Sequence, residues 1–228
     1  MTMQFRTLRT LFILSLVALL ATGCAHRRQK AFDYTAYKQS DPKSILVLPP
    51  LNSTPDIKAT NSMLSFMTRP LAEAGYYVFP VAVMDETFKQ NGLSTAGDIH
   101  AVPINKLQEI FGADAALYVN VTKYGSVYTV INSETVVAAE ARLVDLKTGQ
   151  LLWTGKASAS SAEQQNNNGG GGIVGVLVSA AVKQVINSLT NESHRYAGVT
   201  SERLLATGHN GILYGPRSPQ YGKGKGQQ

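Results

Sequence analysis

Residues 135–159 constrain the fold most, because their pattern predicts two long strands joined by a tight turn. Within 135–145, apolar residues at every second position alternate with a wetter set, as in a strand with one dry and one wet face. Residues 147–149 supply a turn that ends in a glycine, and 151–159 return as the partner strand. The drier set is Val137, Ala139, Ala141 and Leu143, and the wetter set is Val136, Ala138, Glu140 and Arg142.

Three segments before the hairpin predict further strands. Residues 44–48 form a short apolar run, and the two prolines that follow remove the backbone donors needed to continue it. Residues 76–83 are expected to form a second strand, which Pro80 interrupts. Residues 115–122 have the apolar character of a buried strand.

Helices are expected on both sides of these strands. The first begins at Thr60 or Asn61 and ends at Gly75, and Pro70 should kink or split it. Further helical segments are expected over residues 85–90, 103–111, 173–189 and 192–206. Strands and helices in this order predict an α/β fold, with a mixed sheet that contains a long antiparallel hairpin and is covered by helices.

The first 24 residues have the pattern of a bacterial lipoprotein signal that ends at Cys24, the single cysteine of the chain. Two arginines precede the apolar run 11–20, and three small residues lead into the cysteine. A run of about ten residues is too short for a bilayer, which takes about 20. An ordinary cleaved signal peptide, or one anchoring helix that contains a cysteine, is the alternative.

A lipid on Cys24 would attach the mature chain to a membrane. Each buried methylene contributes about 0.8 kcal/mol, and a single acyl chain binds only marginally. Similarity to bacterial lipoproteins implies three acyl chains such as palmitate, and therefore permanent attachment. Ala25 favours the outer membrane in the sorting rule of such lipoproteins, so the domain would face the periplasm or the cell surface. No thiol then remains for a disulfide, and the core must stabilise the fold.

Composition predicts four regions along the chain. Residues 1–23 are the signal peptide, and 24–43 are the lipidated cysteine and a flexible tether. Residues 44–211 form a single α/β domain that contains a flexible, low-complexity loop at 160–172. Residues 212–228 are expected to be a disordered basic tail.

Positive charge is concentrated near the two ends of the chain. Without the two arginines of the signal, 19 basic residues face 15 acidic ones, whereas residues 31–200 hold 12 basic and 14 acidic ones. A nucleic-acid binder should carry its cations clustered on a folded face, so no nucleic-acid partner is expected. Cations at the ends suit a bilayer surface, where each gains about 1 kcal/mol, or a solubilising tail.

Two motifs that resemble ligand sites lack the necessary context. Gly170, Gly172 and Gly175 satisfy G-x-G-x-x-G, but a polar run precedes them instead of the strand that a dinucleotide site requires. A flexible loop explains them. The histidines are scattered, without i,i+4 spacing or a neighbouring cysteine, so no metal site and no cofactor are expected. They are His26, His100, His194 and His209.

Catalytic arrangements receive no support either. Ser126 lacks the second glycine of a nucleophile elbow. Glu134 and Glu140 share a strand face but lie about 20 Å apart at 3.3 Å per residue. Glycoside hydrolysis needs carboxyl groups about 5 to 9.5 Å apart, so solvated sheet positions are the better interpretation. We expect no catalytic residues and no enzymatic activity.

Two stretches carry a resemblance to envelope lipoproteins, namely 113–121 (ADAALYVNV) and 141–155 (ARLVDLKTGQLLWTG). In the first stretch a strand follows G-A-D, and in the second a strand pair is joined by D-x-x-T-G and ends in L-W-x-G. This combination resembles the fold shared by the TolB amino-terminal domain, the curli secretion lipoprotein CsgG and activators of penicillin-binding proteins. Over nearly its whole length the chain is similar to a family of Gram-negative lipoproteins that includes a genome-derived neisserial antigen. Asp145, Thr148 and Gly149 form the turn, and Trp153 is a core anchor rather than a ligand platform.

The resemblance implies outer-membrane attachment, self-association and a role in envelope transport or assembly. We therefore expect a non-enzymatic interaction module with envelope protein partners. A subunit or accessory of a CsgG-like secretion channel is the alternative, although the wetter face of hairpin 127–159 contains Val136, Ala138 and Val144. A role as an activator of cell-wall synthesis is a weaker alternative. A tether over 25–43 reaches at most about 65 Å, which keeps the domain near its own membrane.

The helix expected over residues 173–189 has more apolar width than one sheet face should need. Val176 and Ala180 lie at the margin of its apolar stripe. Exposed apolar patches mark interfaces, and a closed two-fold dimer is the default arrangement. A homodimer is therefore expected, and a helix buried within one subunit is the alternative.

Overall fold

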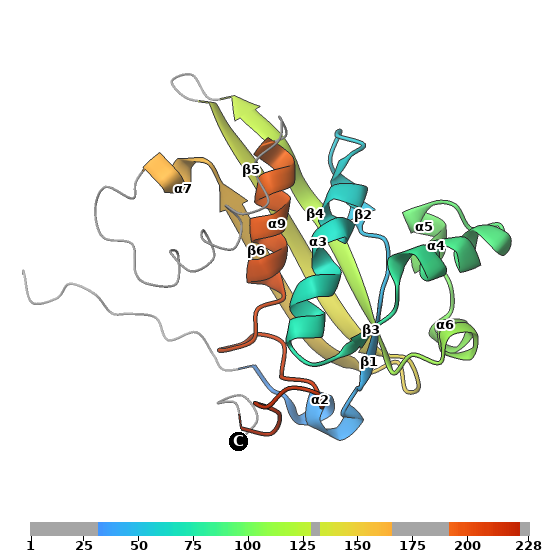
Figure 1. Ribbon diagram of the computed structural model, residues 1–228. Coiled ribbons are helices and arrows are strands. Elements are labelled where there is room, and N and C mark those ends of the chain that lie inside the picture. Colours follow the sequence, from blue (N-terminus) through green and yellow to red (C-terminus); the bar gives the residue numbers. More distant parts are fainter. Residues whose placement is uncertain (1–31, 129–132, 166–191, 224–228) are drawn as a thin grey trace, which may run out of the picture. The chain divides into compact units, whose positions relative to one another are not determined.

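The computed structural model describes residues 32–128, 133–165 and 192–223 (Figure 1). The predictions for the signal 1–23, for Cys24, for loop residues 166–172 and for the helix over 173–189 lie outside these residues. Within the described part, none of the helices combines the length and the hydropathy of a membrane span.

A mixed sheet forms the centre of the domain. Its strands are β1 (Ser44–Val47), β2 (Leu51–Asn52), β3 (Tyr77–Val78), β4 (Ala115–Tyr128), β5 (Ser133–Asp145) and β6 (Leu151–Ser160). They lie in the order β3-β1-β4-β5-β6, and β2 pairs with β4. β1 is parallel to β3 and β4, whereas β4, β5 and β6 are antiparallel. The predicted mixed sheet with its long antiparallel hairpin is confirmed.

Seven helices are described around this sheet, and five of them form two groups. The seven are α2 (Thr35–Ser40), α3 (Ala59–Glu73), α4 (Val81–Gln90), α5 (Ala96–His100), α6 (Ile104–Phe111), α7 (Ala162–Gln165) and α9 (Glu192–Leu204). α3 and α9 pack side by side on one face of the sheet, whereas α4, α5 and α6 lie together beside β1 and β2 (Figure 1). Part of the opposite face of β4, β5 and β6 is thereby left open.

The predicted alternation in β5 decides which residues face α9. Val137, Ala139 and Leu143 are at most 1% exposed, and Thr200 of α9 donates a hydrogen bond to the Val137 carbonyl at 3.1 Å. Trp153 of β6 is buried, and its indole N–H donates to the Asn210 carbonyl at 2.9 Å. The dry face and the role of Trp153 as a core anchor are both confirmed.

Proline positions explain two differences from the prediction: α3 is not split at Pro70, and the strand expected over 76–83 is shorter. α3 runs unbroken through Pro70, because this residue lies in the last turn, where its ring is buried and only one backbone hydrogen bond is lost. The predicted end at Gly75, which has φ of 98°, is confirmed. The strand expected over 76–83 shrinks to β3, because Pro80 cannot donate to a ladder and instead precedes α4, accepting a hydrogen bond from the Met84 amide.

The predicted tether and tail are wrong where the structure describes them. Residues 32–43 contain α2, whose Tyr37 is 2% exposed. Residues 212–223 are part of the folded domain, and Ile212 and Leu213 are buried in its core. The hydroxyls of Tyr37 and Tyr76 lie 2.9 Å apart, and Tyr76 donates to the Leu213 carbonyl at 2.7 Å. The large aromatic rings bury enough area to order both segments. The polar composition of these segments had predicted no such burial. The folded domain therefore covers residues 32–223 rather than 44–211.

The segment 160–172 also begins differently from the prediction. Its first residues form α7, and Glu163 accepts two hydrogen bonds from the Arg203 guanidinium, at 2.7 and 3.0 Å. A two-pronged ion pair of this kind orders a polar turn without apolar burial. The flexible-loop prediction is wrong for these residues.

Candidate functional site

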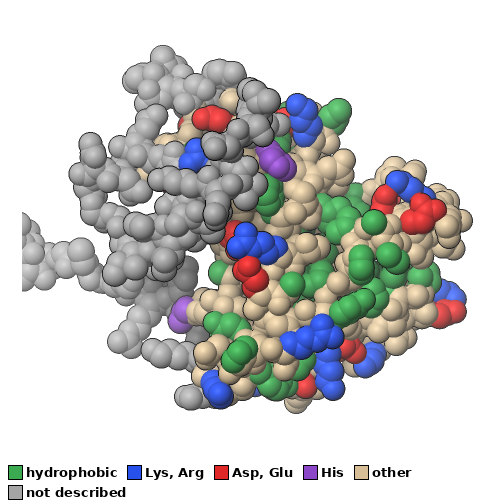
Figure 2. Space-filling view, viewed as in Figure 1, with side chains coloured by type: hydrophobic (Ala, Val, Ile, Leu, Met, Phe, Trp, Pro, Cys, Tyr) green, Lys and Arg blue, Asp and Glu red, His purple; other side chains and the backbone are tan. Residues whose placement is uncertain are grey.

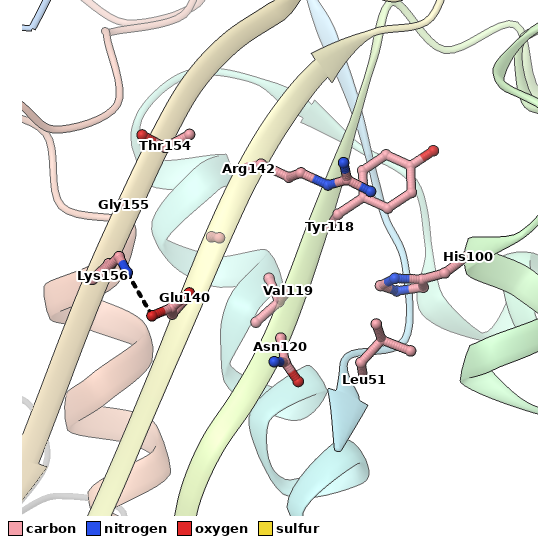
Figure 3. A pocket seen from close by; sticks show the side chains of 11 residues that line it. Leu51, His100, Tyr118, Val119, Asn120, Glu140, Arg142, Thr154, Gly155 and Lys156 are labelled. Carbon is pink, nitrogen blue, oxygen red and sulfur yellow. Dashed lines mark hydrogen bonds and ion pairs between the residues drawn. The ribbon is translucent and has the colours of Figure 1, made fainter. Parts of the chain in front are cut away.

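The face of the sheet opposite α3 and α9 carries a pocket of about 370 Å³ over β4, β5 and β6 (Figure 3). Two rows of directly paired residues cross these strands, and paired residues point to the same face. One row is Tyr118, Arg142 and Thr154, and the other is Asn120, Glu140 and Lys156. His100 from α5 and Leu51 from β2 form the wall. We call this site the Arg142 pocket.

Arg142 lies across the strands with its guanidinium over the Tyr118 ring (Figure 3). The guanidinium carbon is 4.6 Å from the ring centroid. The ring is only 5% exposed, and His100 packs edge-on against it with centroids 5.2 Å apart. No hydrogen bond or ion pair joins the Arg142 side chain to another described residue, so its guanidinium N–H donors are available to the pocket.

His100 holds a defined tautomer in the pocket wall. Its Nε2 lies 2.9 Å from the Pro49 carbonyl oxygen, which can only accept, so Nε2 carries the proton. Burial lowers the pKa of His100 and the charge of Arg142 lowers it further, while the Pro49 hydrogen bond acts in the opposite direction. The ring is therefore neutral at pH 7, with Nδ1 as an acceptor. α5 is fixed by Thr95, whose hydroxyl accepts from the Asp98 amide.

The second row leaves the pocket with a net positive charge. Glu140 forms an ion pair with Lys156 at 2.6 Å (Figure 3). The Ser53 hydroxyl donates to the amide oxygen of Asn120 at 2.9 Å. The Glu140 carboxylate is thus committed to Lys156, while Arg142 has no acidic counterpart among the lining residues. The lining side chains carry two cations and one anion.

Other predicted candidates lie apart from this pocket. Glu134 is half-buried near the start of β5, away from Glu140. His194 of α9 shares a hydrogen bond of 2.7 Å with Ser62 of α3, and His209 is exposed after α9. In residues 32–128, 133–165 and 192–223, no three His, Cys, Asp or Glu side chains are grouped to hold a metal ion.

Ser62 and His194 do not form a nucleophilic site. Ser62 lies near the start of α3, and its amide is already bonded to the Lys58 carbonyl at 2.9 Å, so that amide cannot stabilise an oxyanion. The His194 ring packs against Phe66 with centroids 4.7 Å apart. We interpret the pair as a packing contact between α3 and α9.

The carboxylates of the two sequence motifs are structural. Asp145 of D-x-x-T-G accepts hydrogen bonds from the Lys147 and Thr148 amides at 2.8 and 2.7 Å, and from Ser40 at 2.5 Å. Asp114 of G-A-D accepts from the Ser44 amide and from the Lys147 ammonium. Burial raises the pKa of each carboxyl, but these hydrogen bonds outweigh it and leave both pKa values lowered.

The sequence predicted the orientation of only two of the side chains that form the pocket. It placed Glu140 and Arg142 on the wetter face of one strand, and period-two alternation in 115–122 could have added Tyr118 and Asn120. His100 had no local signal, because its approach to Tyr118 depends on where α5 packs.

Comparison with known proteins identifies the family. The family model described as "Putative lipoprotein GNA1162-like" matches residues 32–217. The chain belongs to this family. One GNA1162-like relative, a lipoprotein of Neisseria meningitidis serogroup B, is 51% identical over 207 residues, covering 90% of this chain and 95% of the relative. The crystal structure of lipoprotein GNA1162 from Neisseria meningitidis matches with 54% identity and a TM-score of 0.53, covering 64% of this chain and all of that one.

Membership of the GNA1162-like family makes this chain a lipoprotein and implies a membrane-anchored place in the cell envelope. The predicted resemblance to the neisserial antigen family is confirmed. The match begins at Phe32, the first described residue, and covers both α2 and the sheet.

Proposed function

We propose that this chain is a non-enzymatic lipoprotein, anchored to the outer membrane through Cys24, whose domain acts as an interaction module in envelope transport or assembly. The observation that carries the proposal is the short distance along the chain between Cys24 and the folded domain. Phe32 is held in place, because its amide donates to the Asn210 side chain at 2.8 Å. From Cys24 to Phe32 the chain spans at most about 29 Å in any conformation.

This limit keeps the module close to its own membrane. The segment 32–43, which contains α2, belongs to the domain, so the reach is less than half of that expected for a tether over 25–43. A short connection favours partners in the same membrane or on its surface. It argues against an activator that must reach cell-wall synthesis at the opposite membrane.

Exposed apolar side chains support a role in binding. Tyr77 of β3, Val83 of α4 and Ile110 of α6 are 41%, 56% and 45% exposed. On the side shown in Figure 2, hydrophobic side chains gather between α3 and α4. Clustered exposed apolar residues in a domain of this size are typical of interaction surfaces.

Anchoring is tested with Cys24→Ala in the native host. We expect complete loss of membrane attachment after carbonate washing, because no acyl chain can be added, with an unchanged circular dichroism spectrum. Ala25→Asp is the matched control, and it should move the protein to the inner membrane while leaving it lipidated. A Cys24→Ala protein that stays in the washed membrane would contradict lipid anchoring.

The interaction role is tested by recovering partners from intact envelopes after cross-linking. The lipidated chain should enrich a defined set of outer-membrane proteins that the Cys24→Ala chain does not recover. Equal recovery by both forms, or recovery of nothing above background, would contradict a membrane-proximal module.

Self-association forms part of the same proposal and rests on the sequence of residues 173–189, which lie outside the described residues. Val176→Glu combined with Ala180→Arg should convert a dimer into a folded monomer in analytical ultracentrifugation. An unchanged dimer would place the interface elsewhere, and loss of folding would make this segment part of the core.

A further inference from the structure

We propose that the Arg142 pocket binds a small anion that joins a carboxylate or phosphate group to an apolar body. The anionic group would lie on the Arg142 guanidinium, and the apolar body would lie against the strand surface and Leu51. This binding site goes beyond the anchored interaction module and does not depend on it.

The first argument is charge. The Arg142 guanidinium makes no ion pair or hydrogen bond with another described residue, while the nearby acid, Glu140, is 2.6 Å from Lys156. An anion would neutralise the remaining positive charge, and a cation would be repelled by both basic groups. The planar guanidinium matches the two oxygens of a carboxylate or phosphate in a bidentate arrangement.

The second argument is pre-organisation. The guanidinium stacks over Tyr118, and the Tyr118 ring is itself held by His100 and almost fully buried. An exposed arginine normally loses rotamer freedom when it binds, and that loss is smaller where stacking already limits its motion.

The third argument is the shape and polarity of the pocket. Its volume of about 370 Å³ lies within the usual 300 to 1,000 Å³ or so of small-molecule sites. Most of its lining surface is apolar, and Leu51 of β2 forms an apolar part of its wall (Figure 3). An inorganic anion would leave this surface in contact with water, whereas a ligand with an apolar body would cover it.

Nitrogen-15 NMR titration of the full lipidated chain in detergent micelles tests the proposal. The probes are benzoate and phenyl phosphate, with acetate and inorganic phosphate lacking the apolar body, and benzyl alcohol and benzylamine lacking the negative charge. We expect shifts at Tyr118, Arg142 and Thr154 with the first two probes, at least ten-fold tighter than with the other four. The tighter of benzoate and phenyl phosphate assigns the anionic group.

Two arginine variants separate a specific site from general attraction. Arg142→Met keeps the length of the side chain and should weaken the tighter probe at least ten-fold. Arg217→Met is the matched control, because Arg217 also stacks on a tyrosine, with its guanidinium 5.4 Å from the Tyr77 ring centroid, but lies outside the pocket lining. It should leave the affinity unchanged.

Two further variants keep the proposal falsifiable if Arg142→Met alters the sheet. Arg142→Lys retains the charge without the fork and should bind less tightly than the unmodified protein. Leu51→Ser should weaken benzoate and phenyl phosphate but not acetate. Three results would overturn the proposal. They are equal affinity in the unmodified and Arg142→Met proteins, binding of benzyl alcohol as tight as that of benzoate and phenyl phosphate, and the absence of shifts at the pocket residues.

Discussion

The two faces of β4, β5 and β6 come from the same strands but have opposite properties. Under α9, Val137 and Leu143 are fully buried and Trp153 anchors the core. On the other face, Glu140 and Arg142, which alternate with those residues in β5, are exposed and line the Arg142 pocket. Strand alternation thus gives one sheet a face that stabilises the domain and a face that is free to bind.

The difference predicts how each face responds to substitution. Burial on the closed face contributes several kcal/mol per large side chain, because cavities are left when atoms are removed. Exposed ion pairs on the open face contribute about 0 to 1 kcal/mol each. Stability measurements should therefore separate the two faces, and the four experiments below test that separation.

Trp153→Ala should have the largest effect, lowering the free energy of unfolding by about 3 to 5 kcal/mol. The indole is 1% exposed, and its N–H is bonded to the Asn210 carbonyl. Urea denaturation followed by circular dichroism measures the change. Trp153→Phe should lose less, since it keeps most of the apolar volume, and a loss below about 1 kcal/mol for the alanine variant would contradict a core role.

Asp145→Ala should lower the free energy of unfolding by about 1 to 3 kcal/mol, because partly buried donors in the hairpin turn lose a charged acceptor. This turn sets the register of β5 with β6, and so decides which residues of the two strands share a face. The lowered pKa of Asp145 adds a pH dependence: the stabilisation is present above pH 4 and is lost as the pH falls through the folded-state value. Stability curves against pH for the unmodified and Asp145→Asn proteins should therefore converge in acid. Parallel curves would show that the Asp145 carboxylate does not cause this pH dependence.

His100 should make the pocket wall sensitive to mild acid. Its folded-state pKa is lowered by burial, with Tyr118 and Arg142 facing the ring, so the unfolded chain binds a proton first. Stability should then fall as the pH drops below about 6.5, the usual histidine value. Thermal unfolding between pH 7.5 and 5 measures this, and His100→Gln should remove that part of the slope. An identical slope in the variant would show that another group is responsible.

Removing the exposed pair of the open face should have the smallest effect. Glu140→Gln with Lys156→Met should change the free energy of unfolding by less than about 1 kcal/mol, because both side chains are largely solvated. The comparison in urea should include Thr200→Val on the closed face, which loses a buried hydrogen bond. If removing the charged pair lowers the free energy of unfolding more than Thr200→Val does, the proposed difference in stability between the two faces is wrong.

Local pattern predicted much of the fold and little of the site. Alternation in β5, the turn after Asp145 and the glycine after α3 are set by neighbouring residues, and all three were predicted. The strand expected over 76–83 failed because apolar content does not distinguish a strand from the start of a helix. Of the pocket side chains, only Glu140 and Arg142 were placed on the correct strand face, and the others depend on how β2, β4, β6 and α5 come together.

The sequence by itself determined the hairpin and the division of β5 into two faces, because each depends on residues close together in the chain. Only the tertiary structure decided that α3 and α9 cover one face, that residues 32–43 and 212–223 pack together through Tyr37 and Tyr76, and that His100 meets Tyr118. These contacts join residues far apart in sequence. They form because burying aromatic area with satisfied hydrogen bonds offsets the entropy of ordering those segments, a balance that no local pattern encodes.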